Sequence, residues 1–316
     1  MGLISNLKYL QADQLYAAAI AGKLKEVPAS FLSELSLRRS ASRAFPKYCA
    51  SDRGVLTKST VAHAAAENGH FAQLPLNVQA ICLGWRDRDY LTVLGLAAKA
   101  GHIGTIPPHY LNGELLRTQE GDAGENAFHH LVKTKTLGQL QQSLLDPVGL
   151  ATSDKDGNIP IIDAFLSKQS EALPEYCWST ALPEIRFNGY LWGNNELPAK
   201  TLVDVVIRDT GSTLIHLAAE TGRLGELPVS VLTEERLLRQ NSDGLSPLYL
   251  ACDMATTTSL WRQIPVALLA KQTDAAGHIH LPYKGTLDCT RLLDVEALDR
   301  IRMHKGGKTE VDPFDL

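Results

Sequence analysis

The sequence predicts an all-α protein, a helical repeat solenoid with short turns or hairpins between helix pairs. Two observations carry this prediction. A glycine stands six residues before a proline four times along the chain: Gly22 and Pro28, Gly69 and Pro75, Gly101 and Pro107, Gly222 and Pro228. In addition, residues 210–219 align with residues 243–252 at an offset of 33 residues. Units of this size cannot bury an apolar face alone, so neighbouring units must stack.

The first unit differs from the later ones because it begins directly with helix. Residues 11–32 lack the turn that opens other units, so we expect them to close the N-terminal end of the stack. Weaker copies of the motif follow, and they lie at residues 60–69, 92–101, 124–129 and 157–162. The second of these carries Gly95 where the first has His63. We therefore expect about seven or eight units of uneven quality.

The recurring small residues have mechanical roles. Paired alanines such as Ala218 and Ala219 let neighbouring helices approach closely, because side-chain bulk sets the distance between helix axes. The glycine after the helix suits a left-handed position that ends it. A Leu-Pro pair then interrupts the second helix, as at residues 74–75, 173–174 and 227–228. This predicts a short first turn, a break, and a new turn that begins at the proline. Residues 232–238 predict a capped helical turn before a short extended link.

The period fails between Pro174 and Pro228, which are 54 residues apart. The stretch from 175 to 208 is rich in aromatic residues and contains a turn-like Asn188-Gly189. It is either a truncated repeat or a loop inserted between repeats, and both alternatives stay open.

The C-terminal segment no longer carries the motif. We expect a repeat solenoid over residues 1–270 and a C-terminal cap and tail over residues 271–316. Within the latter, residues 294–304 have a partly helical apolar spacing that suits a cap over the last repeat, and residues 306–316 form a tail.

The repeats resemble the ankyrin family. A period of 33 residues with a turn, a Thr-Pro-Leu-His-x-Ala-like helix start and a second helix is typical of that family, and residues 210–219 and 243–252 match it best. The proline in the second helix departs from the usual ankyrin pattern. The resemblance implies that His63, His129 and His216 tie backbone segments together instead of acting in catalysis. It also implies a binding scaffold for another protein.

Composition narrows the classes of partner. The net charge is −4, so the chain lacks the basic character of a nucleic-acid binder, and we expect no direct nucleic-acid partner. No run is long and apolar enough to span a membrane, and no signal peptide is recognised. We therefore expect a cytoplasmic protein without a membrane partner. Its five cysteines are odd in number and widely spaced, which favours reduced thiols over a disulfide framework.

No pattern of catalytic residues is recognised, so we expect no enzymatic activity and no cofactor. His278 and His280 would share one face of a strand, but no Cys-x-x-Cys pair accompanies them. A solvated turn is therefore favoured over a metal site there, and we expect no metal.

Three functions stay open. The favoured one is a scaffold that holds a partner protein along its concave face and turn tips. A second is an inhibitor, immunity or effector protein that masks an enzyme such as a nuclease or toxin, for which mild acidity would suit a basic target. The third is an enzyme or cofactor-binding protein with its site in residues 175–208. By register, the expected protein-binding residues are Arg88, Tyr90, Glu125, Asn158, Tyr190, Trp192, Ser212 and Leu245. Tyr190 and Trp192 also suit a plug in the protein's own core, since aromatic side chains dominate buried surfaces as well as interfaces.

Overall fold

The computed structural model describes residues 2–38, 59–87, 89–182, 201–207, 209–253, 278–281 and 285–288. The chain divides into two compact units, residues 1–177 and 178–316, which we call unit 1 and unit 2. The boundary falls at the start of the stretch where the sequence period fails. The expected division at residue 270 stays a prediction.

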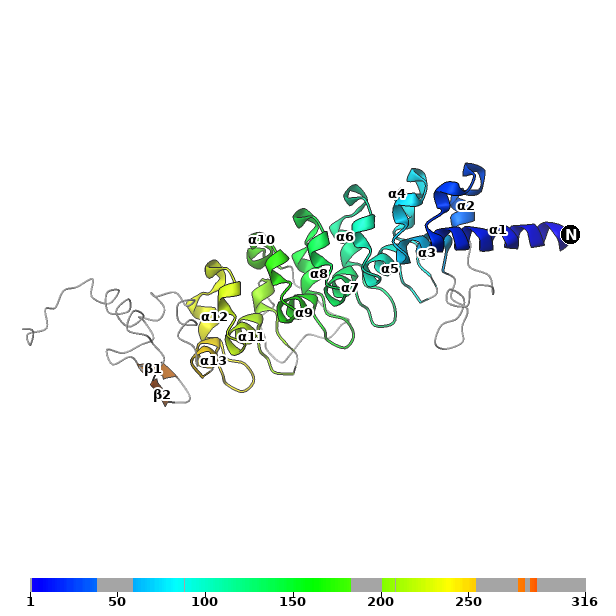
Figure 1. Ribbon diagram of the computed structural model, residues 1–316. Coiled ribbons are helices and arrows are strands. Elements are labelled where there is room, and N and C mark those ends of the chain that lie inside the picture. The colour runs from blue at the N-terminus through cyan, green and yellow to red at the C-terminus, as the bar shows by residue number, and fades with distance from the viewer. Residues whose placement is uncertain are drawn as a thin grey trace, which may run out of the picture. The chain divides into compact units, whose positions relative to one another are not determined.

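Unit 1 is a row of mutually packed inner helices, all short except α1 (Figure 1). Each packs against the next in chain order: α1 Gly2–Ala21, α3 Val61–Glu67, α5 Val93–Lys99, α7 Ala127–Lys133 and α9 Pro160–Leu166. Small buried residues such as Ala65 and Ala98 line the contacts, which permits the close approach of neighbouring axes. α1 begins well before residue 11, where helix was expected from the sequence.

The second helix of each repeat is split, as predicted. In most units one 3-10 turn follows the inner helix, the chain extends for one or two residues, and a second turn begins at or just after the proline. Pro75, Pro107 and Pro228 all have φ near −57° and ψ near 135°, so they interrupt the helix. The 3-10 turns of unit 1 are η1 Leu24–Glu26, η2 Ala29–Phe31, η4 Phe71–Gln73, η5 Ile103–Thr105, η6 Pro108–Tyr110, η7 Leu137–Gln139, η8 Gln142–Leu144 and η9 Ser170–Ala172. The outer helices are α2 Glu34–Leu37, α4 Leu76–Cys82, α6 Gly113–Arg117, α8 Pro147–Ala151 and α10 Glu175–Ser179.

The predicted left-handed glycines are confirmed. The four glycines of the motif end their inner helices with φ between 68° and 79°. Two repeats have no glycine there. Lys135 and Lys168 take the same position, with φ of 59° each. A side chain in this conformation costs about 1–2 kcal/mol, because Cβ approaches the following carbonyl.

Unit 2 contains two inner helices in its described part, α11 Leu214–Glu220 and α13 Pro247–Asp253, which pack together. Its remaining helical elements are η10 Leu202–Asp204, η11 Leu224–Glu226, η12 Val229–Val231 and α12 Glu234–Leu238. α12 confirms the predicted helical turn, although Thr233 caps it without a side-chain hydrogen bond. Arg236 of α12 binds both carboxylate oxygens of Asp204, at 2.8 and 2.9 Å.

The all-α, ankyrin-like repeat architecture predicted from the sequence is confirmed. One addition lies beyond the repeats: β1 His278–Leu281 and β2 Gly285–Asp288 form an antiparallel hairpin in which His280 pairs with Thr286. His278 and His280 therefore lie in a strand, and the solvated turn expected from the sequence is wrong. The expected cap at 294–304 and tail at 306–316 lie outside the described residues, as does the stretch from 183 to 200.

Candidate protein-binding surface

A buried histidine joins each of two inner helices, α7 and α11, to the next repeat. In α7, the Nδ1 atom of His129 accepts a hydrogen bond from the backbone N–H of Asn126 at 3.1 Å, and Nε2 donates to the Asn158 carbonyl at 3.1 Å. His216 makes the matching bonds to Thr213 and to the Leu245 carbonyl, at 3.1 and 3.2 Å. Both carbonyls belong to the residue two positions before the start of the next inner helix. The predicted structural role of these histidines is thus confirmed.

Two variations on this tie occur at the N-terminal end of unit 1. Tyr16 of α1 takes the histidine position, and its hydroxyl donates to the Ser59 carbonyl. His63 of α3 accepts from Thr60 N–H at 3.2 Å, while its Nε2 has no well-formed hydrogen bond. Burial lowers the pKa of His63 and of His216 to about 4. These rings are therefore neutral at pH 7 and serve the fold.

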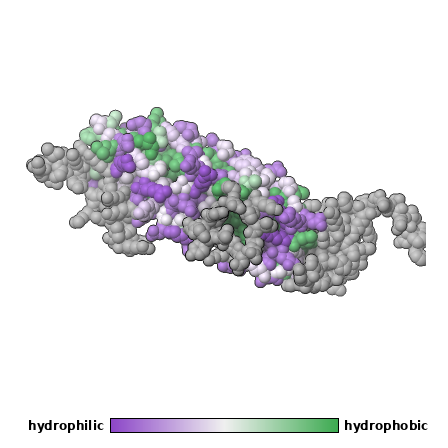
Figure 2. All heavy atoms as spheres, turned by 180° about the vertical axis from the view of Figure 1, so that it is seen from behind, coloured by the Kyte–Doolittle hydropathy of each residue, from purple (hydrophilic) through white to green (hydrophobic). Residues whose placement is uncertain are grey.

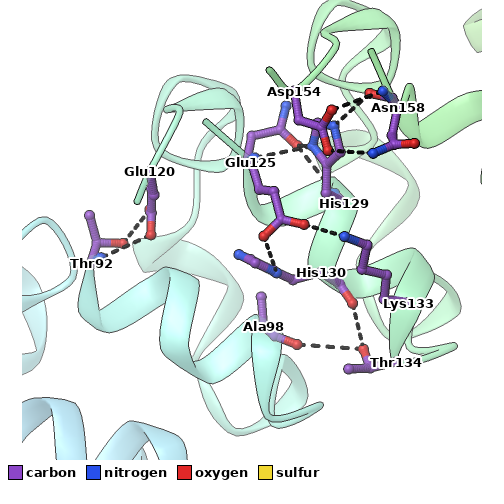
Figure 3. Close-up of polar contacts among 11 residues, drawn as sticks. Thr92, Ala98, Glu120, Glu125, His129, His130, Lys133, Thr134, Asp154 and Asn158 are labelled. Atoms are coloured by element: carbon purple, nitrogen blue, oxygen red, sulfur yellow. Dashed lines mark hydrogen bonds and ion pairs between the residues drawn. The ribbon is translucent and has the colours of Figure 1, made fainter. Parts of the chain in front are cut away.

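In α5 the histidine is absent and a glutamate from the next hairpin replaces it. Gly95 stands at the position of the ring, and a Cβ there would lie 1.8 Å from Oε2 of Glu120. The Glu120 carboxylate is almost fully buried and accepts from the backbone N–H of Thr92 at 2.8 Å and from its hydroxyl (Figure 3). Burial raises the pKa of Glu120 despite these hydrogen bonds. Glu120, in the space that Gly95 leaves, thus accepts the hydrogen bond from the N-cap N–H that a histidine ring accepts in α7.

A charged cluster lies where the hairpin before α7 meets the exposed face of that helix. The Glu125 carboxylate forms an ion pair with Lys133, and it lies 3.7 Å from Nδ1 of His130 (Figure 3). Burial alone would raise the pKa of Glu125, but Lys133 and His130 hold it below its usual value. Burial lowers the pKa of His130 to about 4. The cluster therefore presents a neutral ring and a satisfied ion pair at pH 7.

The hairpin tips of unit 1 are hydrogen-bonded to one another. Gly121 N–H donates to the Tyr90 carbonyl at 3.4 Å, and Lys155 N–H donates to the Ala123 carbonyl at 2.9 Å. Within the tips, the side chain of Asp154 accepts from two backbone N–H groups of its own turn. We call this series of turns, residues 87, 89–91, 121–124 and 154–158, the tip row. The hydrogen bonds between these residues fix their backbone before a partner binds, which reduces the entropic cost of binding.

The expected binding residues fall in different environments. Tyr90 is 61% exposed, with φ of 60°, and Asn158 is also exposed at its tip. Glu125 is half-buried in the charged cluster, and Leu245 is half-buried in unit 2. Ser212 is buried, and its hydroxyl accepts a hydrogen bond from Asn241 at 3.0 Å. Arg88, Tyr190 and Trp192 lie outside the described residues.

A shallow depression that the sequence did not indicate lies between the C-terminal ends of α7 and α9. It has a volume of about 410 Å³. Its lining combines aliphatic and charged side chains, from Val132, Lys133, Lys135, Asp163, Leu166 and Ser167. Leu166 is 51% exposed there. No local spacing in the sequence could have indicated this hollow, because it forms between residues about 33 apart in the chain.

The surface shows no large continuous apolar area on the face seen in Figure 2, where green spheres lie in scattered groups among purple and white ones. Leu35, Leu76 and Val229 are among the exposed large apolar residues. In the described part of the chain, no helix has the length and apolar character needed to cross a membrane. Three or more His, Cys, Asp or Glu side chains do not gather into a metal-binding group among those residues either.

Comparison with known proteins finds likeness at the level of the fold. No protein-family model and no curated protein sequence matches the chain. Among solved structures, an ankyrin repeat protein from Leishmania major has 13% sequence identity and a TM-score of 0.47, covering 95% of this chain and 97% of that one. The ankyrin repeat domain of Bcl-3, described as a unique member of the IkappaB protein family, has 18% identity and a TM-score of 0.42, covering 75% and 92%. With scores this low, the ankyrin-like character of the fold stands on this chain's own hairpins, helices and ties.

Proposed function

We propose that this ankyrin-like repeat protein is a non-catalytic scaffold that binds another protein through its tip row and the exposed faces of its inner helices. The tip row carries the proposal, because its turns are hydrogen-bonded to one another and Tyr90 projects from it largely exposed. Aromatic side chains on an ordered backbone give large contact areas at little entropic cost.

The proposed contact residues are Tyr90, Asn158 and the exposed parts of the Glu125 cluster in unit 1, with Leu245 in unit 2. Ser212 is left out, because a buried side chain cannot contact a partner without rearrangement. The buried side chains that form the ties are also left out, since they join neighbouring repeats and do not contact solvent.

The test is affinity capture with the full chain, followed by mass spectrometry and by direct binding measurements with the partner that is identified. Tyr90→Ala should weaken binding while the unfolding midpoint changes little, because the side chain is exposed. Asn158→Ala should weaken binding too, but it also removes the hydrogen bond from Asn158 to Asp154 and should lower the midpoint. Leu76→Ala is a matched control, since Leu76 is exposed on outer helix α4, away from the tip row. Equal affinities for the tip variants and the wild type would refute the proposed surface. A fall in the catalytic activity of a captured enzyme would favour the masking function instead of a recruiting scaffold.

A further inference from the structure

The left-handed residue that follows each inner helix and its C-cap distinguishes α7 and α9 from the other repeats. Four repeats place glycine in this left-handed position, but α7 and α9 place Lys135 and Lys168 there, with φ of 59° each. A lysine in this conformation strains the backbone where glycine would not. Strained residues of this kind concentrate at binding sites and switch regions, which favours a binding role for these two lysine side chains.

One of the two lysines lines the depression between α7 and α9, and the other is the chain neighbour of a lining residue. Lys135 lines it directly, and Lys168 follows Ser167, which also lines it. The apolar part of the lining comes from Val132 and from Leu166, whose side chain is half exposed. The depression is therefore suited to an aliphatic side chain that enters between two cationic groups.

The charge around the depression is locally positive although the whole chain carries −4. Lys133 is neutralised by Glu125, and Asp163 is the acid among the lining residues. Neither Lys135 nor Lys168 forms an ion pair with any described residue, and the same is true of Lys99 on neighbouring helix α5. These three exposed lysines outnumber the one acid of the lining, Asp163, so the charge there favours an anionic segment.

We propose that this site holds an extended acidic segment of the partner protein, with an aliphatic side chain in the depression and carboxylates on Lys135 and Lys168. This proposal rests on the proposed function and names the chemistry of the partner at one site. The axes of packed helices lie about 8–10 Å apart. In the extended polyproline II conformation a chain advances about 3.1 Å per residue with three residues per turn, so carboxylates three residues apart lie on one face and match two lysines in consecutive repeats.

The test uses a labelled twelve-residue peptide whose centre is Glu-Leu-Ser-Glu, measured by fluorescence anisotropy against the full chain. The same peptide with both glutamates changed to glutamine is the charge control. We expect the acidic peptide to bind more tightly than its control, and the difference to shrink as salt rises, because salt screens exposed charges.

The variant Lys135→Gly/Lys168→Gly separates binding from folding. Glycine removes the strain, so the unfolding midpoint should rise, while affinity for the acidic peptide should fall about 2- to 30-fold, the loss expected for two exposed ion pairs. Lys23→Gln/Lys25→Gln removes two exposed lysines elsewhere in unit 1 and should leave affinity unchanged.

Two outcomes would overturn the inference: equal binding of the acidic and neutral peptides, including no binding of either, or wild-type affinity in the double glycine variant. A captured partner that is lost with Tyr90→Ala but retained by Lys135→Gly/Lys168→Gly would overturn it as well. That last result would leave the proposed function standing, so the two failures are distinguishable.

Discussion

Replacing Glu120 with alanine should destabilise unit 1, and replacing Gly95 with histidine at the same time should reverse most of the loss. Glu120→Ala leaves the backbone N–H of Thr92 buried without its acceptor, since the residue is only 4% exposed. An orphaned buried donor costs about 1–3 kcal/mol. Removing a carboxylate that is costly to bury offsets part of this loss.

Gly95→His alone should also destabilise, for a different reason. A Cβ at this position would lie 1.8 Å from Oε2 of Glu120, so the carboxylate must be displaced from its site. Overfilling of this kind costs about 1–3 kcal/mol. If the two effects were independent, the double variant would lose about 2–6 kcal/mol. If histidine takes over the role it has in α7, the double variant should instead lie within about 1 kcal/mol of the wild type.

The free energies of unfolding should be compared by chemical denaturation of all four proteins, with hydrogen exchange of the Thr92 amide as a local measurement. Protection of that amide should fall in Glu120→Ala and return in the double variant. Glu171→Ala, which removes an exposed glutamate from unit 1, is the control for a change in net charge. Additive losses in the double variant would refute the idea that Glu120 replaces a histidine.

Further variants test the helix ends, the helix contacts and the buried histidines. Gly222→Val should lower the unfolding midpoint, because it forces a branched side chain into a position with φ of 69°, whereas Lys135→Gly should raise it by relieving the same strain. Ala218→Phe should cost about 1–3 kcal/mol by overfilling the contact around a fully buried residue, and an unchanged midpoint would mean that the register is wrong. The lowered pKa of His63 and of His216, about 4 in each case, predicts that stability falls as the pH drops from about 6.5 toward 4. In that window the unfolded chain binds more protons than the folded one, so a denaturation midpoint that rose on acidification would contradict the assignment of neutral rings.

The features that local backbone geometry dictates could be predicted from the sequence. Gly22 and Gly222 stand where only a left-handed residue ends the helix, and Pro75 stands where the second helix breaks. Each of these residues has a conformational property that the sequence states directly. The histidine ties were expected on a different ground, because His63, His129 and His216 fall at the helix-start position that the ankyrin family gives to histidine.

Features that depend on distant residues could not be predicted. Nothing near Gly95 indicates that its missing ring is replaced by Glu120, which comes from the following hairpin. Lys135 and Lys168 carry no sign of their left-handed conformation, since lysine is compatible with an ordinary helix. Ser212 was expected at an exposed tip, but the register could not show that its hydroxyl turns inward to Asn241.

The specificity of a scaffold built in this way must come from positions that the ties leave free. The side chains that form the ties stabilise the fold and cannot contact a partner. This holds for Tyr16, for His129 and for Glu120. The last residue of each inner helix from α3 to α11 is different. It lies at the exposed end of the helix, and its chemical character changes from one repeat to the next. It is an acid in α3 and α11, a lysine in α5 and α7, and a leucine in α9. Since these side chains contribute little to the core, they can vary without destabilising the stack. A partner that contacts the α5, α7 and α9 face therefore meets Lys99, then the Lys133–Glu125 ion pair, then the exposed Leu166. Of these positions, Lys99 and Leu166 suit an acidic segment with an aliphatic anchor better than a basic one.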